Sequence, residues 1–363
     1  MAGPDTVLWS WGPGESRLAL LADGEVVELV VDRPELWAGS LFLGRVVAVD
    51  RQLDAAFVDI GIGDRPGFLP GAKRLGLTEG QALPVQVRAD AWGGKGPLLA
   101  VATECGAGDR KAPALLRRSH PLERLVETYP AITRIVADDV AAFAEARALF
   151  PTLAERGEVD LDDAFAAALA PVVVLPSGGR LVIEPTAALT AIDVDSGAGR
   201  AGDANREAVA AIARQLRLRR IGGQVVVDFV SGPKGTPYRL AAGLKKVVAA
   251  DPVPTHVFGV TPLGMVELVR ERRGPSLAEV LCRRSQGPSA ETTALTALRR
   301  VLAEAVGRPG LAPVLVVAPE VAAALGRLGE AVAEAGRRLG RPLMVRAEPG
   351  RAWEDTMIEE ARK

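Results

Sequence analysis

Three carboxylates in the middle of the chain stand where a metal ion could bind. A short apolar run, residues 188–194, breaks at an acidic turn that contains Asp193 and Asp195. A second apolar run, residues 224–230, carries Asp228 near its end, and an amphipathic helix pattern joins the two runs. This order predicts a strand–helix–strand unit. If the strands are parallel, a right-handed crossover brings Asp193 and Asp228 to one rim of a sheet.

Carboxylates that converge at a sheet rim repel one another, and a hard divalent cation relieves this repulsion. Mg²⁺ suits such a rim, because it takes one or two carboxylates, keeps water ligands and accepts phosphate oxygens. Mn²⁺ is a possible substitute. An ordinary explanation stays open at this point, because Asp, Ser and Gly after a strand also form turns and helix caps. Asp228 could equally be a plain residue at a strand end.

The connecting helix, expected over residues 203–220, carries a basic stripe beside its apolar face. Arg214 and Arg217 belong to this stripe. A row of charges like this one is usually a solvated surface. Beside an acidic metal rim, it could instead neutralise the phosphates of a substrate.

Composition limits the kinds of function that are open to the chain. Its 363 residues are enough for two or three domains, and 48% hydrophobic with 25% charged residues is ordinary for a soluble globular protein. The net charge of −1 means that any nucleic-acid surface must be local. Two histidines and two isolated cysteines argue against a Ser-His-Asp hydrolase, a disulfide framework and a cysteine zinc site. With no signal peptide and no apolar stretch of the ~18 residues that a membrane helix needs, we expect a cytoplasmic protein without a membrane partner.

Residues 37–104 differ from the rest of the chain in their pattern of residue types. Five short β-branched runs, separated by Gly and Asp, predict a small closed barrel of the OB type. Phe57 and Phe68 lie in neighbouring runs, with basic residues such as Lys95 around them. Rings framed by cations are typical of surfaces that bind single-stranded nucleic acid. Both rings could equally be part of the barrel core.

The other segments predict supporting structure. Residues 16–31 form two strand-like runs around Asp23-Gly24, which is a strong hairpin signal. Residues 114–129 predict a helix, 132–136 a strand, and 171–189 a hairpin. The tail predicts a helix from residue 291, a strand at 313–317, one helix at 320–339 and a strand at 342–347. This tail is predicted to form a small α/β module, and none of its residues suggests a functional site.

The stretch GRVVAVDRQLDAAFVDIGIGDRPGFLP resembles an S1 RNA-binding domain, whose pattern places one aromatic before Val-Asp-x-Gly and another in Gly-Phe-Leu-Pro. In S1 domains of this kind both aromatics face the RNA, and a lysine in a late Gly-x-Lys-Gly strand contacts it. The resemblance therefore implies RNA contacts for Phe57, Phe68 and Lys95. It favours exposed rings over a barrel core.

Three further stretches resemble the catalytic core of the ribonuclease E/G family, in its order and spacing: LPSGGRLVIEPTAALTAIDVDSGAG, ARQLRLRRIGGQVVVDF and LGMVELVRERRGPSL. The resemblance implies a multidomain α/β (α+β) protein. A ribonuclease-H-like fold, residues 1–36 and 105–187, would contain the inserted S1 domain, residues 37–104. A DNase-I-like catalytic subdomain (188–285) and a small C-terminal α/β domain (286–363) would follow.

The same resemblance implies a Mg²⁺-dependent endoribonuclease that acts on single-stranded RNA, in ribosomal RNA maturation or messenger turnover. Asp193 and Asp228 map to the family's metal-binding aspartates, and hydrolysis would leave 5′-phosphate and 3′-hydroxyl ends. Asp195 stands where the family usually has Asn. Two roles stay open for it: a third catalytic carboxylate that joins the metal shell, or a charge that repels the substrate phosphate.

Other departures from the family favour an alternative function. Cys282-Arg-Arg-Ser285 replaces a CxxC, so no zinc link between protomers is expected, although a homodimer remains possible. Between Thr103 and Ala114 there is no counterpart of the Arg-Thr element that senses a 5′-monophosphate. Ala89 and Trp92 replace two basic residues, which predicts weaker RNA binding. The alternative is an RNA-binding protein, derived from the family, that has little or no catalytic activity.

Overall fold

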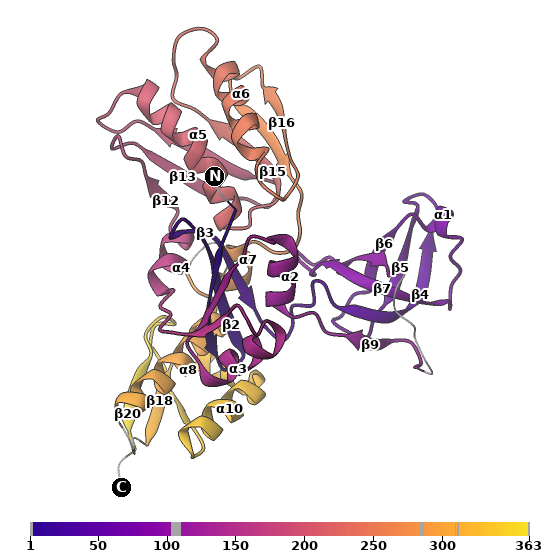
Figure 1. Cartoon of the computed structure of the whole chain (residues 1–363), viewed down its shortest axis with the longest axis vertical. Coiled ribbons are helices and arrows are strands. Elements are labelled where there is room, and N and C mark those ends of the chain that lie inside the picture. The colour runs from indigo at the N-terminus through magenta and orange to yellow at the C-terminus, as the bar shows by residue number, and fades with distance from the viewer. Residues whose placement is uncertain (1–2, 103–109, 284–286, 309, 311, 362–363) are drawn as a thin grey trace.

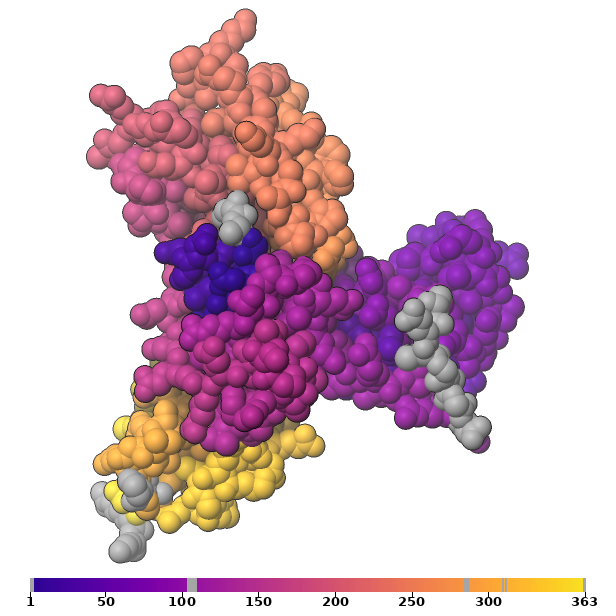
Figure 2. Space-filling model, in the orientation of Figure 1, coloured from indigo at the N-terminus to yellow at the C-terminus, as the bar shows by residue number. Residues whose placement is uncertain are grey.

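The computed structural model describes residues 3–102, 110–283, 287–308, 310 and 312–361. Over these residues the chain forms four sheets. A central sheet lies in the middle of the molecule, a barrel projects to one side of it, a six-stranded sheet with two helices lies above, and a small domain lies below (Figure 1). The space-filling view shows the barrel standing clear of the rest of the body (Figure 2).

The central sheet has the order β11-β10-β1-β2-β3. Its strands are β1 (Thr6–Gly12), β2 (Glu15–Ala22), β3 (Glu25–Asp32), β10 (Arg134–Ala137) and β11 (Ala154–Arg156). The predicted hairpin is confirmed as β2–β3, and Asp23 and Gly24 have φ values of +52° and +80°. Two positive φ values are what a two-residue turn between twisted strands requires. Strand β1 was not predicted, although it is the middle strand of this sheet.

Helices cover both faces of the central sheet. Helices α2 (Pro121–Thr128) and α3 (Val140–Leu149) pack on one face, around Trp9, Leu18 and Ile135. The other face is covered by α4 (Asp162–Leu169) and α7 (Leu277–Leu281), together with the end of α5. The segment expected to be one helix from residue 114 divides differently: 114–117 is strand β9, and α2 begins only after its N-cap, His120.

The barrel confirms the fold predicted for residues 37–104. Its strands are β4 (Leu41–Asp50), β5 (Ala55–Asp59), β6 (Gly67–Pro70), β7 (Ala82–Ala89) and β8 (Leu98–Val101), with the short helix α1 (Ala72–Leu75) after β6. The order β5-β6-β8-β7-β4 closes by a pairing of β4 with β5. Strand β9 (Ala114–Arg117) pairs with the first residues of β4, on the edge away from β7. The barrel sheet therefore extends past residue 104, the boundary that the sequence predicts.

The upper sheet has the order β12-β13-β14-β15-β17-β16. Its strands are β12 (Val172–Val174), β13 (Arg180–Pro185), β14 (Thr190–Asp195), β15 (Gly223–Asp228), β16 (Thr255–Val260) and β17 (Val266–Arg270). Only β14 and β15 are parallel, and α5 (Ala201–Leu218) joins them, as the strand–helix–strand pattern predicts. Helices α5 and α6 (Thr236–Val248) cover one face over Ile192, Val227 and Ile212.

The C-terminal domain is a three-stranded sheet with the order β19-β18-β20, packed against three helices. Its elements are α8 (Ala290–Gly307), β18 (Pro313–Val317), α9 (Pro319–Arg327), α10 (Gly329–Leu339), β19 (Met344–Ala347) and β20 (Met357–Glu360). The single helix expected over 320–339 is two helices, because Leu328, at φ −86° and ψ 37°, leaves the helical conformation. Strand β20 was not predicted.

A buried carboxylate joins this domain to the central sheet. Glu15, 2% exposed, accepts hydrogen bonds from Arg17 at 2.7 Å and from Nη2 of Arg33 at 2.8 Å. Arg33 also donates to Thr292 of α8, and Arg299 of α8 donates to the Glu15 carbonyl at 2.6 Å. Burial alone would raise the pKa of Glu15, but the three arginines lower it below its ordinary value.

Among the described helices, none is both long enough and apolar enough to span a bilayer.

Candidate functional site

Asp193 and Asp228 lie directly opposite each other at the carboxyl ends of β14 and β15. Their neighbours Ile192, Val194 and Val227 are buried under α5. Because side chains alternate along a strand, both aspartates point to the opposite face, which is open to water. The two carboxylates therefore share one rim, as the sequence pattern predicts. Their role as metal ligands stays a prediction.

The rim carries negative charge that its surroundings do not fully neutralise. Burial raises the pKa of Asp193, and the charges of Asp228 and Asp195 raise it further, against a smaller opposing effect of Arg180. Within the described part of the chain, no three His, Cys, Asp or Glu side chains are grouped to hold a metal ion. The donor set at the rim is thus a pair of carboxylates. It fits Mg²⁺, which proteins usually hold through one or two carboxylates while it keeps several waters.

Asp195, the departure from the family pattern, is already engaged in other contacts. The backbone N–H of Gly197 donates to its Oδ1 at 2.8 Å, and Nη2 of Arg180 donates to its Oδ2 at 2.6 Å. These two bonds lower the pKa of Asp195. Arg180 faces Asp195 in the register of β13 and β14. Both oxygens of Asp195 already accept hydrogen bonds, and its role as a third catalytic carboxylate stays a prediction.

A buried amide fixes the loop that follows Asp228. Nδ2 of Asn205 donates to the Val230 carbonyl at 2.7 Å, and the Val230 N–H donates to Oδ1 of Asn205 at 3.0 Å. Asn205 lies in the first turns of α5 and is 3% exposed. Asn205 is not among the functional residues that the sequence predicts. The available signal was a polar residue beside Ala204 on the apolar face of an amphipathic helix.

The turn between β12 and β13 packs tightly against the loop that follows Asp195. A Cβ atom added to Gly179 would lie 2.7 Å from the Asp195 carbonyl oxygen, and one added to Gly199 would lie 2.7 Å from the Ser177 carbonyl oxygen. Both positions therefore require glycine. The N–H of Ser177 also donates to Glu207 of α5 at 2.9 Å. These contacts hold the acidic turn in place from the side of β13.

Arg214 and Arg217 lie away from the carboxylate rim, contrary to the expectation. Helix α5 runs antiparallel to β14, so at 1.5 Å per residue Arg214 lies about 20 Å along the helix from its first turn. Nη2 of Arg214 donates to the Val26 carbonyl at 2.8 Å, and Arg217 pairs with Glu28 at 3.4 Å. Both arginines thus attach α5 to β3. The structure gives them no role at the rim.

Phe57 and Phe68 lie on the outer surface of the barrel. They are opposite each other on β5 and β6, with ring centroids 6.0 Å apart in an edge-to-face arrangement. Their neighbours Val58 and Leu69 fill the barrel core, whereas the two rings are only half-buried. The reading in which both rings belong to the core is therefore excluded. With Lys95, the rings line a pocket of about 470 Å³, called the ring pocket below.

Trp92 adds a third ring to the ring pocket. The Lys95 ammonium lies 4.6 Å and the Arg272 guanidinium 4.3 Å from the Trp92 ring centroid. Arg272 follows β17 and therefore belongs to the upper sheet rather than to the barrel. From the sequence, Trp92 is only the replacement of a basic residue. Its contact with Arg272 could not be predicted, because Arg272 is distant in the sequence and is brought to the pocket by the tertiary fold.

The other departures from the family pattern lie in less informative positions. Cys282 follows α7 and packs against the apolar cluster of α4 and α7, and burial raises its pKa. Cys105, Ser285 and most of the segment between Thr103 and Ala114 lie outside the described residues.

Comparisons with known proteins agree with the resemblance that the sequence shows. Residues 107–273 match the model of the Ribonuclease E/G family. The chain is 32% identical to Ribonuclease G of Salmonella typhimurium over 207 residues, covering 52% of this chain and 42% of that protein. It is 43% identical to Ribonuclease E of Nostoc sp. over 122 residues, covering 31% of this chain and 18% of that protein.

The matching part includes the carboxylate rim. A further relative, Ribonuclease E of Escherichia coli, is 39% identical over 153 residues, covering 37% of this chain and 14% of that protein. The chain thus spans less than half the length of these curated relatives. Asp193, Asp228 and the connecting helix all lie within residues 107–273. Residues 107–273 of the chain, which include this rim, are therefore assigned to the ribonuclease E/G family.

Proposed function

We propose that this chain is a divalent-metal-dependent endoribonuclease that cuts single-stranded RNA. The observation that carries the proposal is the pairing of Asp193 with Asp228 at the water-exposed ends of β14 and β15, within the residues that match the ribonuclease E/G family. The two aspartates would hold Mg²⁺, or Mn²⁺ in its place. In this proposal the upper sheet is the DNase-I-like catalytic subdomain, and the central sheet is the ribonuclease-H-like part into which the S1 barrel is inserted.

When bound, Mg²⁺ would supply Lewis-acid chemistry, by lowering the pKa of a water molecule and stabilising charge on the scissile phosphate. The chain's own residues determine where this happens. Asp193 and Asp228 orient the reacting groups at the rim, and the two hydrogen bonds of Asn205 support the loop beyond Asp228. Arg180 neutralises Asp195, so that the rim presents less negative charge to an incoming phosphate.

The barrel would supply the selectivity for single strands. Phe57, Phe68 and Trp92 expose ring surface around one pocket, and Lys95 adds a positive charge beside it. Bases can stack on such rings only when they are unpaired and splayed out. Each stacked base contributes about 1–3 kcal/mol, largely independent of sequence. A duplex would lose this contribution.

The test is cleavage of an end-labelled, unstructured RNA with Mg²⁺, with Mn²⁺ and with EDTA. We expect wild-type cleavage in either metal and none in EDTA, and a loss of roughly a hundredfold or more for Asp228→Ala, because a metal ligand is removed. Asp163→Ala, which removes an exposed carboxylate on α4, is the matched control and should cleave normally. A wild type that is inert in both metals, or an equally active Asp228→Ala, would refute the proposal.

One observation favours the alternative of an RNA-binding protein with little catalysis. The described residues group only two free carboxylates at the rim, and the third is engaged by Arg180. RNA binding that depends on Phe57 and Phe68, without turnover in the same assay, would support this alternative.

A further inference from the structure

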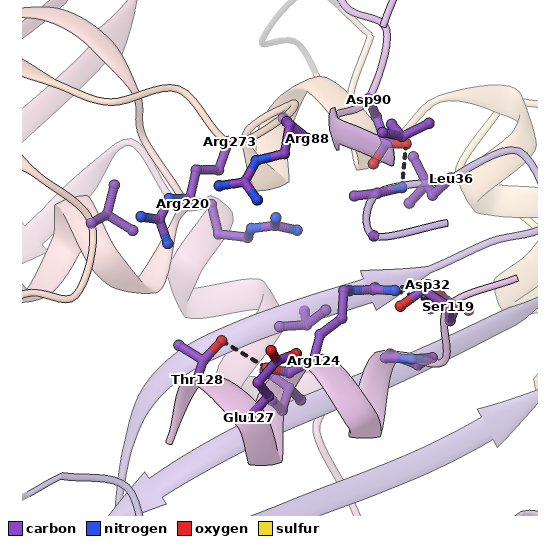
Figure 3. A pocket seen from close by; sticks show the side chains of 18 of the residues that line it. Asp32, Leu36, Arg88, Asp90, Ser119, Arg124, Glu127, Thr128, Arg220 and Arg273 are labelled. Atoms are coloured by element: carbon purple, nitrogen blue, oxygen red, sulfur yellow. Dashed lines mark hydrogen bonds and ion pairs between the residues drawn. The ribbon is translucent and has the colours of Figure 1, made fainter. Parts of the chain in front are cut away.

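A second cavity lies where the barrel, the central sheet and the upper sheet meet. It has a volume of about 480 Å³, and we call it the arginine cleft. One wall is formed by α2 of the central part, and the facing wall by the end of β7, the residues after α5 and the residues after β17. Figure 3 shows this cleft from close by. None of its side chains has a role in the proposed cleavage.

Three arginines from three different segments gather on the wall opposite α2. Arg88 comes from β7, Arg220 follows α5 and Arg273 follows β17, and their side chains lie together in the cleft (Figure 3). Like charges in this proximity repel one another, so the arrangement is favourable only if an anion shares it. The question is whether the protein itself supplies that anion.

The protein itself supplies few anionic partners to the three arginines. Within the described part of the chain, Arg220 makes no ion pair and no side-chain hydrogen bond, although its backbone is held at a φ of +54°. Among the residues that the structure describes, the amide oxygen of Gln86, at 3.4 Å, is the only polar partner of the Arg88 side chain. Arg273 lies 3.4 Å from the Pro252 carbonyl and 3.6 Å from Glu271, which are long contacts at an exposed side chain.

Two acidic side chains of the cleft, Asp90 and Asp32, have other partners. Oδ1 of Asp90 accepts the backbone N–H groups of Trp37 at 2.5 Å and Ala38 at 2.9 Å. Asp32 pairs with Arg124 on the opposite wall, at 3.8 Å. Asp90 is close enough to Arg220 for the two charges to interact, but it makes no ion pair with any of the three arginines. Of the other acidic side chains in the described lining, Glu271 makes only the long contact to Arg273, and Glu127 on α2 pairs with none of the three arginines. An external anion can therefore complete the site.

The arginine cleft adjoins the ring pocket. Leu98 of β8 and Arg272 line both cavities, and Arg272 is the neighbour of Arg273 in the chain. A strand whose bases lie on the rings would therefore carry its phosphates to the cleft. We propose that Arg88, Arg220 and Arg273 form a phosphate-binding site that takes a backbone phosphate of the RNA held in the ring pocket. This inference rests on the RNA binding in the proposed function but not on catalysis.

The test is binding of a fluorescent 12-nucleotide RNA, followed by anisotropy in EDTA so that no cleavage occurs. We expect the double variant Arg88→Ala/Arg220→Ala to bind roughly tenfold more weakly, because charge-assisted contacts to phosphate are lost. The dependence of log K on log salt should become shallower by about 0.7 for each lost phosphate contact. Arg134→Ala, at an exposed residue of β10 that pairs with Glu155 on β11, is the matched control and should change neither quantity.

A second series identifies the source of the phosphate. If the site takes backbone phosphates, 5′-hydroxyl and 5′-phosphate RNAs should lose the same affinity in the double variant. If only the 5′-phosphate RNA loses affinity, the site takes a terminal phosphate and the backbone assignment is overturned. Thermal melting checks folding, and we expect the double variant to melt no lower than wild type because a repulsion is removed.

The outcomes also separate this inference from the proposed function. If Phe57→Ala/Phe68→Ala abolishes binding while the arginine variants keep wild-type affinity and salt slope, the cleft assignment fails and the proposed function stands. If the wild type binds no RNA, both fail.

Discussion

The amide of Asn205 and the main chain of Val230 exchange two hydrogen bonds, at 2.7 and 3.0 Å, and so attach the loop beyond Asp228 to the start of α5. Helix α5 also carries Arg214 and Arg217, which attach it to β3 of the central sheet. One helix therefore connects the carboxylate rim to the centre of the molecule. The position of Asp228 depends on contacts at both ends of that helix.

Asn205→Ala should damage both stability and cleavage. The substitution leaves the half-buried Val230 N–H and carbonyl without their Asn205 partners, which costs about 1–3 kcal/mol of unfolding free energy. Because the loop beyond Asp228 loses its anchor, kcat should fall more than KM rises. Urea unfolding and cleavage kinetics measure the two effects. Arg206→Ala, at the exposed neighbouring residue, is the control, and equal kcat values for the two variants would contradict the anchoring role.

Asp193→Asn should stabilise the fold while it removes activity. The pKa of Asp193 is raised above the ordinary 3.8, mainly by burial and by Asp228 and Asp195, so the folded chain binds this proton more tightly than the unfolded chain does. Ionised Asp193 therefore lowers stability, and wild-type stability should increase as pH falls through the raised pKa. We expect Asp193→Asn to melt higher than wild type at pH 7, with the difference disappearing near pH 4.

Melting curves with Mg²⁺ complete this test. Mg²⁺ should raise the melting temperature of the wild type, because it binds only the folded rim, and should leave Asp193→Asn unchanged. A variant that melts below the wild type at pH 7 would show that the repulsion at the rim is not significant.

Arg180→Ala should slow cleavage more than Asp195→Asn does. Removing Arg180 exposes an unpaired Asp195 carboxylate beside Asp193, which repels the substrate phosphate and raises KM. Asp195→Asn removes the charge together with the need for Arg180, so its cleavage should remain within a few-fold of wild type. The double variant Arg180→Ala/Asp195→Asn should recover most of the loss. If it is as slow as Arg180→Ala, then Arg180 contacts the substrate itself.

Trp92→Ala should weaken RNA binding, although the loss of a basic residue at this position predicts weak binding in the wild type. Removing a stacking ring costs about 1–3 kcal/mol of binding free energy. Trp92→Phe keeps a ring beside Lys95 and Arg272 and should restore most of the affinity. Anisotropy titrations measure both variants. Equal affinity of Trp92→Ala and wild type would show that Trp92 only packs the barrel against Arg272.

Glu15→Gln should destabilise the junction between the central sheet and the C-terminal domain. It leaves Arg17 and Arg33 buried without their carboxylate, which costs about 3–5 kcal/mol. Since the pKa of Glu15 is lowered below 4.5, its contribution is present above that pH and is lost as pH falls through the lowered value. Urea unfolding from pH 7 to pH 3 measures this. Glu155→Gln, a surface pair, should cost less than about 1 kcal/mol.

Much of the fold could be predicted because its signals are local. The Asp23-Gly24 turn and the alternating runs of the barrel determine neighbouring strands. Strand β1 was missed because its seven residues end at Gly12-Pro13, which looked like a loop. The helix expected from residue 114 was wrong at its start, because pairing of β9 with β4 outweighs local helix propensity.

The residues of the candidate site could likewise be predicted only where local signals place them. Asp193 and Asp228 could be placed together, because period-two alternation and the handedness of the crossover decide which ends of the strands meet. The basic stripe of α5 was recognised, but not that a crossover helix runs back towards the far end of the strands. The contact of Arg272 with Trp92 could not be predicted, since it joins two separate sheets of the tertiary fold.

The direct opposition of Asp193 and Asp228 also has a consequence for folding. A shift of one residue in the pairing of β14 would turn its side chains to the other face, which would bury Asp193 under α5 and expose Ile192 and Val194 to water. Burying an unpaired carboxylate costs far more than ordinary strand pairing contributes. The aspartate therefore acts against mispaired folding intermediates. A variant with a neutral residue at this position is expected to populate the shifted strand pairing more often during folding, even where its native state is more stable.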